Sequence, residues 1–144
     1  MRSGQASELS MLRIAASLAG LLLGCGMSAR LAAAELKSGE QVYKETCFAC
    51  HATGVAGAPK FGDQKAWAPL LKEGQRVLTA HAWVGVRGMP PKGGRADLSL
   101  EEFARAAAYM ARAAGGSWKD PDAKVLRHIR EEEQERIKRL KAAK

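Results

Sequence analysis

The sequence has few of the side chains from which a small protein normally builds its core. It contains three Trp, three Phe and two Tyr in 144 residues, and 27 of the residues in its 47% hydrophobic share are Ala. Only 20 large apolar residues lie between Glu35 and Ala114. A domain of roughly 80 residues with so thin a core usually needs a disulfide, a metal or another staple. This composition excludes a large enzyme with a deep cleft.

Long apolar runs are also scarce, which excludes a membrane protein with several spans. The single candidate run, Ile14–Gly24, follows Arg2 and Arg13 and precedes an Ala-rich end at Leu31–Ala34. A charged start, a short apolar middle and an Ala-x-Ala end are typical of a secretory signal. A bilayer span needs about 20 residues, so this run is short for one. We predict that residues 1–34 are a signal peptide and that the mature chain is periplasmic.

Cys25 gives this leader a second interpretation. Leu22–Cys25 resembles a bacterial lipobox, in which the cysteine is lipidated and becomes the first residue. The mature chain would then be a membrane-anchored lipoprotein facing the periplasm. The alternative is a signal-peptide cysteine without chemistry.

Beyond the leader only two cysteines remain, within Cys47-Phe48-Ala49-Cys50-His51. A disulfide between them would close a tiny loop and restrict the unfolded chain little. C-x-x-C-H is the attachment pattern of a c-type haem, because two thiols on one helical turn can bond one haem edge while the next imidazole faces the iron. A thioredoxin-like site would need a βαβ context, and a zinc site usually needs a second ligand pair. Neither is evident.

The candidate for a second axial ligand of such an iron is Met89, in Gly88-Met89-Pro90-Pro91-Lys92. Two prolines stiffen the chain directly after Met89. A Met/His pair of ligands raises the reduction potential of the iron. The alternatives are a Met89 that fills a core gap and His81 as the ligand. Met110 lies inside a predicted helix and is interpreted as core.

The remaining sequence predicts an all-α protein. Capping signals, apolar spacing and Gly or Pro punctuation predict helices over 38–48, 67–73, 76–84 and 97–114, with loops over 52–65 and 86–94. Fifteen of the last 26 residues are charged, and Asp120-Pro121 is a good helix start. We therefore divide the chain into the leader 1–34, a domain 35–114 and an extension 115–144 that forms a charged, solvent-exposed helix.

Together these motifs resemble a class I c-type cytochrome, closest to the bacterial cytochrome c5 group. The resemblance covers about residues 37–113. Its matching pieces are the segments 39–43, 47–51, 54–60 (GVAGAPK), Gly62-Asp63 with Trp67, 88–94 (GMPPKGG) and the helix through Tyr109-Met110. Cytochrome c5 proteins often carry a second cysteine pair after the GMPPKGG loop. This chain has Arg95-Ala96-Asp97 there instead, and its extension from Ser117 is outside the pattern.

The resemblance implies a small cytochrome c fold around one covalently bound haem c. It implies thioether bonds at Cys47 and Cys50 and axial ligation by His51 and Met89. An iron with both axial positions filled has no open place for a substrate, so we expect no enzymatic activity. The expected function is one-electron transport in the periplasm, by outer-sphere transfer through an exposed haem edge.

Supporting roles follow from the same resemblance. The carbonyl of Pro59 is expected to accept a hydrogen bond from His51 and orient its ring. Trp67 is expected to support the pocket, either by donating to a haem propionate or as plain core. Gly39 is expected to let the first helix cross the last helix of the domain closely, with Tyr43 and Tyr109 at the crossing.

Charge points to the class of partner. The chain has a formal net charge of +8. Basic residues near the haem edge, with Lys60, Lys92 and Arg95 as candidates, would steer it toward acidic redox-partner proteins. Export and the scarcity of clustered aromatic and basic residues disfavour nucleic acid as a partner. Two alternatives stay open: a subunit docked to a larger redox complex through the extension, and a haem peroxidase or gas-binding protein if Met89 is off the iron.

Overall fold

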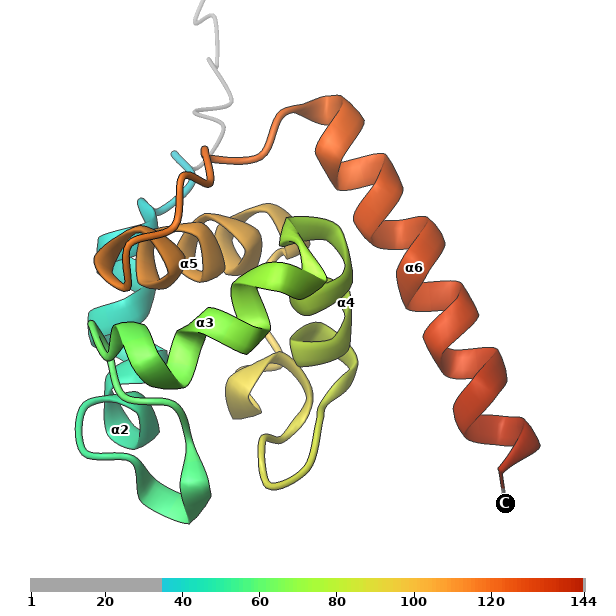
Figure 1. The fold of residues 1–144 in the computed structure, drawn as a ribbon. Helices are drawn as coiled ribbons and strands as arrows, with labels where there is room; N and C mark the ends of the chain where they lie inside the picture. Colours follow the sequence, from blue (N-terminus) through green and yellow to red (C-terminus); the bar gives the residue numbers. More distant parts are fainter. Residues whose placement is uncertain (1–34, 144) are drawn as a thin grey trace, which may run out of the picture. The chain divides into compact units, whose positions relative to one another are not determined.

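The computed structural model describes residues 35–143, which form an all-α fold (Figure 1). Its helical elements are α1 (Gly39–Val42), η1 (Tyr43–Cys47), α2 (Phe48–His51), η2 (Val55–Gly57), α3 (Gln64–Glu73), α4 (Gln75–Val84), η3 (Pro91–Gly94), α5 (Leu100–Ala113) and α6 (Ala123–Ala142). Within 35–143 the only β pairing is an isolated antiparallel bridge between Val86 and Met89. No helix in that range is long and apolar enough to cross a membrane. The predicted signal peptide and Cys25 lie outside the described residues.

The first helical segment is longer than the predicted 38–48 and changes pitch on the way. It begins with the predicted capping box, in which the Ser38 hydroxyl accepts from Gln41 N at 3.2 Å and the Gln41 side chain accepts from Ser38 N at 2.8 Å. From Tyr43 to Cys47 the turns widen into a π-helix, closed by Phe48 N donating to Tyr43 O. The segment continues as α2 to His51. One unbroken helical rod therefore carries both the α1 contacts and the C-x-x-C-H motif.

Helix α5 crosses α1 at the expected glycine. A Cβ on Gly39 would lie 2.2 Å from the carbonyl oxygen of Arg105 and 3.0 Å from Tyr109 Cβ. The rings of Tyr43 and Tyr109 lie 5.7 Å apart beside this crossing. Because no side chain fits between the two backbones, the close approach depends on the glycine.

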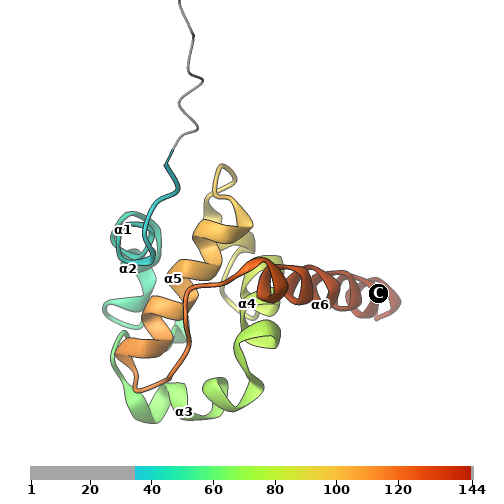
Figure 2. The same ribbon diagram turned by 90° about the horizontal axis from the view of Figure 1, so that it is seen from above.

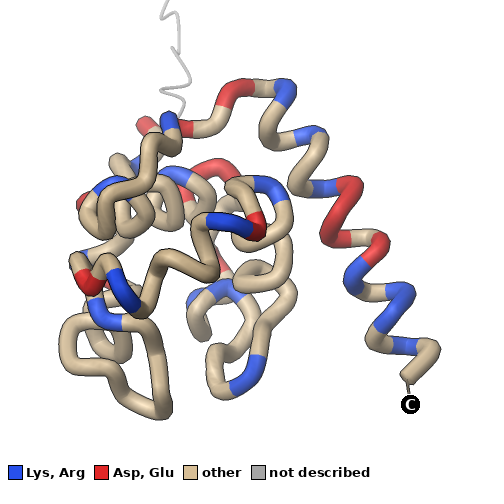
Figure 3. The backbone as a smooth tube through the Cα atoms, in the orientation of Figure 1, with Lys and Arg blue, Asp and Glu red and all other residues tan. Residues whose placement is uncertain are grey.

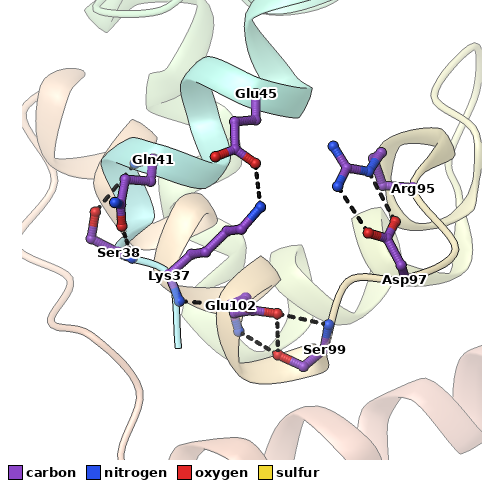
Figure 4. Close-up of polar contacts among 8 residues, drawn as sticks. All are labelled: Lys37, Ser38, Gln41, Glu45, Arg95, Asp97, Ser99 and Glu102. Atoms are coloured by element: carbon purple, nitrogen blue, oxygen red, sulfur yellow. Dashed lines mark hydrogen bonds and ion pairs between the residues drawn. The ribbon is translucent and has the colours of Figure 1, made fainter. Parts of the chain in front are cut away.

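The starts of α1 and α5 are joined by polar contacts (Figure 4). Helix α5 begins with the predicted capping box, in which the Ser99 hydroxyl accepts from Glu102 N at 3.2 Å and Glu102 accepts from Ser99 N at 3.1 Å. The same carboxylate accepts from the backbone of Lys37 at 3.2 Å, and the Lys37 side chain contacts Glu45. One glutamate thus closes its own helix start and ties down the residues that precede α1.

Helices α3 and α4 are separated only by Gly74, which adopts a φ of 84° that favours glycine. Helix α3 starts three residues before the predicted 67, because Asp63 caps it by accepting from Ala66 N at 3.0 Å. Helix α4 contributes Thr79, Ala80 and Trp83 to the buried core. The indole ring of Trp83 packs edge-on against Phe103 of α5 at 5.3 Å between centroids.

The prediction of a solvent-exposed C-terminal helix is wrong for one face of α6. This helix runs along α4 in both ribbon views (Figures 1 and 2). Ile129 is 0% exposed, Val125 and Leu126 are half-buried against the core, and the indole of Trp83 donates to Glu133 at 3.0 Å. The apolar stripe is broken in the sequence because the next positions on the buried face of α6 are Glu132 and Glu133, which contact α4 through their carboxylates. Helix α6 also begins at Ala123, capped by Asp122, rather than at Asp120-Pro121.

Candidate cofactor site

A cavity with an empty volume of about 1200 Å³, open mouth included, lies among α2, the loop after it, α3, α4, α5 and the loop that carries Met89. Cys47, Cys50, His51 and Met89 all line it, as do Pro59 and Trp67. Its other walls are mostly apolar, with Leu70, Leu78, Ala82, Phe103, Ala106 and Met110 among them. The side chains singled out from the sequence therefore meet at one cavity, although they come from four separate stretches of chain.

The two thiols of the motif occupy different environments. Cys47 is 9% exposed, whereas Cys50 is exposed, and both are free. Burial, with a smaller contribution from Cys50, raises the pKa of the Cys47 thiol to about 11. At neutral pH Cys47 is therefore a protonated, weakly nucleophilic thiol.

This burial predicts a pH dependence of thiol reactivity in the haem-free chain. We expect iodoacetamide to alkylate Cys47 slowly at pH 8, with a rate that rises until about pH 11, because the thiolate is the nucleophile and its pKa is raised to about 11. Peptide mass mapping after timed quenching measures each cysteine separately. The urea-unfolded chain is the control and should react at Cys47 with an ordinary thiol's pH profile. Equal Cys47 profiles in the two samples would contradict the prediction when far-UV circular dichroism shows that the haem-free chain is helical.

His51 is held from both its ring and its backbone. Its side chain is buried, and Nδ1 lies 2.9 Å from the carbonyl oxygen of Pro59. Its own carbonyl accepts from Phe61 N at 2.7 Å. A carbonyl partner fixes Nδ1 as the protonated nitrogen, which leaves Nε2 with its lone pair available for a metal.

Trp67 supports this loop rather than reaching outward. The side chain is 4% exposed, and its indole N–H donates to the carbonyl of Lys60 at 2.8 Å. That donor is therefore engaged by the backbone and does not take the propionate role considered from the sequence. The ring centroid lies 6.4 Å from that of His51. Trp67 thus packs beside the histidine and ties down the residue that follows Pro59.

Met89 lies in a constrained loop. Its N–H donates to Val86 O at 2.9 Å, and Val86 N–H donates to Met89 O at 3.1 Å. Between them Arg87 has a φ of 53°, an unusual conformation for a residue with a side chain. Prolines 90 and 91 follow directly and lead into η3. The bridge and the prolines restrict where the thioether can go.

The rival ligand His81 is not brought to the cavity. It lies on the α6 side of α4, with Nε2 3.7 Å from Glu132 and Nδ1 3.8 Å from Glu73. Met110 is buried, as expected of a core residue, and also lines the cavity. Of the two methionines that line the cavity, Met89 is therefore brought there by a loop and Met110 by helix α5.

The charged residues expected near the mouth are only partly available. Arg95 pairs with Asp97 at 2.9 Å, and Lys92 lies over the Trp83 ring, while Lys60 is exposed. Figure 3 marks where basic and acidic residues lie along the backbone. The sequence did not single out Arg87, which is exposed and lines the cavity, or two exposed apolar residues on its lining segments, Phe48 (55%) and Val55 (51%). The sequence signal for each was its position alone: Phe48 lies inside C-x-x-C, Val55 follows the motif, and Arg87 lies two residues before Met89.

The donors in this cavity fit a covalently tethered haem. Two thiols three residues apart, one imidazole with Nε2 available and one thioether surround a space with apolar walls, the surroundings that a large apolar macrocycle requires. Among residues 35–143 no cluster of three or more His, Cys, Asp or Glu side chains could hold a bare metal ion.

Comparison with known proteins decides the family. A family model described as "Cytochrome C oxidase, cbb3-type, subunit III" matches residues 34–110. Cytochrome c5 of Azotobacter vinelandii is 42% identical over 76 residues, which cover 51% of this chain and 92% of that protein. The chain belongs to the c-type cytochromes.

Further relatives place this cytochrome close to c5. Cytochrome c-555 of Chlorobaculum tepidum is 42% identical over 77 residues, covering 51% of this chain and 71% of that protein. A solved structure described as "Crystal structure of electron transfer complex of nitrite reductase with cytochrome c" matches with 46% identity and a TM-score of 0.52, over 56% of this chain and 99% of that one. The cytochrome is thus an all-α class I protein close to c5, an electron carrier rather than an enzyme, and its cofactor is covalently bound haem c. Helix α6 lies beyond the residues that the family model matches.

Proposed function

We propose that this cytochrome is a periplasmic one-electron carrier with Cys47 and Cys50 as thioether anchors and His51 and Met89 as axial ligands. The observation that carries the proposal is the convergence of all four side chains on one apolar cavity. When bound, the haem supplies a one-electron iron couple. The chain's own residues then have to hold the ligands, limit water and leave room for a partner.

The ligand residues are held by their neighbours in the chain. Pro59 fixes the ring of His51, and the paired backbones of Val86 and Met89 fix the thioether. The apolar walls keep water from the ligands, and a thioether opposite an imidazole favours the reduced iron, so we expect a fairly positive potential. With both axial positions taken by protein, transfer would be outer-sphere, through whichever haem edge the open mouth of the cavity leaves accessible.

The residues on the segments around the mouth suit a transient redox partner. Val55 and Arg87 line the cavity and are exposed, so they bring an apolar and a positively charged side chain to its mouth. An apolar patch with basic side chains fits a partner protein with an acidic rim, and such steering weakens with salt. The similar solved structure is a complex of nitrite reductase with a cytochrome c, which supports a redox enzyme as the general kind of partner.

Export by residues 1–34 would place the carrier in the periplasm, with Glu35 as the first mature residue. Lipidation of Cys25 would instead leave it anchored to a membrane. A subunit role in a larger redox complex is the second candidate, favoured by the description of the matching family model and by a structured α6 beyond the match. If deletion of residues 117–144 leaves every co-purifying partner in place, the extension is not a docking element.

The test is to express the full chain in cells with haem-attachment machinery and analyse the exported protein. We expect an intact mass with one covalent haem on a chain starting at Glu35, a ferric iron–thioether absorption band, and no carbon monoxide binding by the reduced protein at neutral pH. A C50A variant should lose one of the two thioether bonds. A colourless folded protein, or ready carbon monoxide binding without the thioether band, would overturn the proposal.

A further inference from the structure

Trp83 connects α6 with the loop that carries Met89. The side chain is buried in α4, and its neighbours come from three other elements. Its indole N–H donates to Glu133 of α6 at 3.0 Å, and its ring meets Phe103 of α5 at 5.3 Å. The ammonium of Lys92 lies 4.7 Å from the ring centroid.

Lys92 belongs to the turn that follows Met89. It has a φ of 55° within η3, and its ammonium also donates to the carbonyl of Ala96 at 3.1 Å. Its backbone carbonyl accepts from Arg95 N at 3.3 Å. The lysine is therefore fixed at both ends, and its position on the indole sets where the turn lies against α4.

The three groups reinforce one another electrostatically. A carboxylate that accepts the indole N–H polarises the ring toward a more negative face, and that face attracts a cation. Glu133 is held in place because its neighbour Glu132 contacts α4, lying 3.7 Å from His81 and 3.9 Å from Arg76. Glu133, Trp83 and Lys92 thus form a continuous chain of contacts from α6 to the Met89 loop.

We infer that Glu133 and Trp83 are positioning residues that hold the Met89 loop through Lys92, so that α6 controls how firmly the thioether stays on the iron. This inference rests on the proposed function, in which Met89 is an axial ligand. It assigns a role in the electron-transfer site to a helix outside the matched family region, none of whose residues lines the cavity.

The experiment is an imidazole titration of the full-length, haem-loaded ferric protein at pH 7, following loss of the thioether band. Imidazole competes with Met89 for the iron, so its apparent affinity reports how firmly the loop holds. We expect E133A to increase that affinity roughly tenfold, the effect of losing one hydrogen bond to a charged group. E133Q keeps an acceptor for the indole N–H and should stay within about threefold of the wild type. E131A removes the same charge from an exposed position of α6 and should change nothing.

Substitutions of Lys92, at the Met89 end of this chain of contacts, test the same connection without changing any residue of α6. K92M should increase imidazole affinity as E133A does, whereas K92R, which keeps the cation, should have the wild-type affinity. The double variant E133A/K92M should differ little from either single variant, because both substitutions break the same chain of contacts. A wild type that shows the band, with E133A and K92M both matching E131A, overturns this inference alone. A wild type without the band overturns the proposed function and this inference with it.

Discussion

Met89→Ala is expected to convert the haem-loaded carrier into a protein that binds carbon monoxide. Without the thioether one axial position is open, since the rival His81 lies on the far side of α4 against Glu132. The ferric iron–thioether band should disappear. The reduction potential should fall by on the order of 0.1 V, within the ≈ 0.8 V range over which axial ligands set haem potentials. Absorption spectroscopy under carbon monoxide and a potentiometric titration measure both effects.

Met110→Ala is the matched control for this variant. Met110 lines the same cavity from α5 and is buried, so its loss removes packing and leaves the ligand loop intact. We expect M110A to be less stable by about 2–5 kcal/mol but to keep the thioether band and to exclude carbon monoxide. If M89A kept the band while M110A lost it, the assignment of the axial ligand would be reversed.

Among the glycines of residues 35–143, Gly39 is the one whose replacement by alanine should cost the most stability. The new Cβ would lie 2.2 Å from the carbonyl oxygen of Arg105, so α1 and α5 would have to move apart. Overpacking against side chains typically costs about 1–3 kcal/mol, and a clash with backbone belongs at or above the upper end. Thermal unfolding of the haem-loaded protein should show a midpoint lower by roughly 10 °C or more.

Gly57→Ala separates this clash from the general cost of replacing a glycine. Gly57 has a φ of 77°, so alanine is strained there, but no atom lies within 4 Å of the added Cβ. We expect it to cost about 1 kcal/mol. A midpoint for G39A no lower than that for G57A would show that the two helices can separate without penalty.

The features predictable from sequence are those set by neighbouring residues. The capping boxes at Ser38 and Ser99 are local patterns, and both are present at the helix starts. The C-x-x-C-H motif and the Pro-flanked Met89 carry their chemistry in consecutive residues. The fold then brings these segments to one cavity. The family's fold supplied that long-range part, since no local pattern specifies which loop faces which helix.

The features that sequence reasoning missed depend on contacts between distant residues. In the sequence Glu133 is indistinguishable from the other glutamates around it. In the structure it accepts a hydrogen bond from the buried indole of Trp83, 50 residues away. Trp67 has one N–H to donate, and which acceptor it meets depends on the path of the loop at Lys60. The charged extension was predicted to be solvent-exposed because its apolar stripe is broken. Ile129 nevertheless becomes fully buried, because α6 packs along α4.

The π-helical turns at Tyr43–Cys47 set the angular relation between the two ends of the first helical rod. Each residue of an α-helix rotates the chain by about 100°, so an added or removed residue shifts everything beyond it by that angle. The wider turns let Gly39 face α5 while the motif after them faces the cavity. A π-turn takes up about one residue more than an α-turn, so the rod holds that extra residue without turning its far end. Removing one residue between Tyr43 and Cys47 should therefore restore regular pitch and leave the thiols facing the cavity, whereas removing one from a regular helix turns everything beyond it by about 100°.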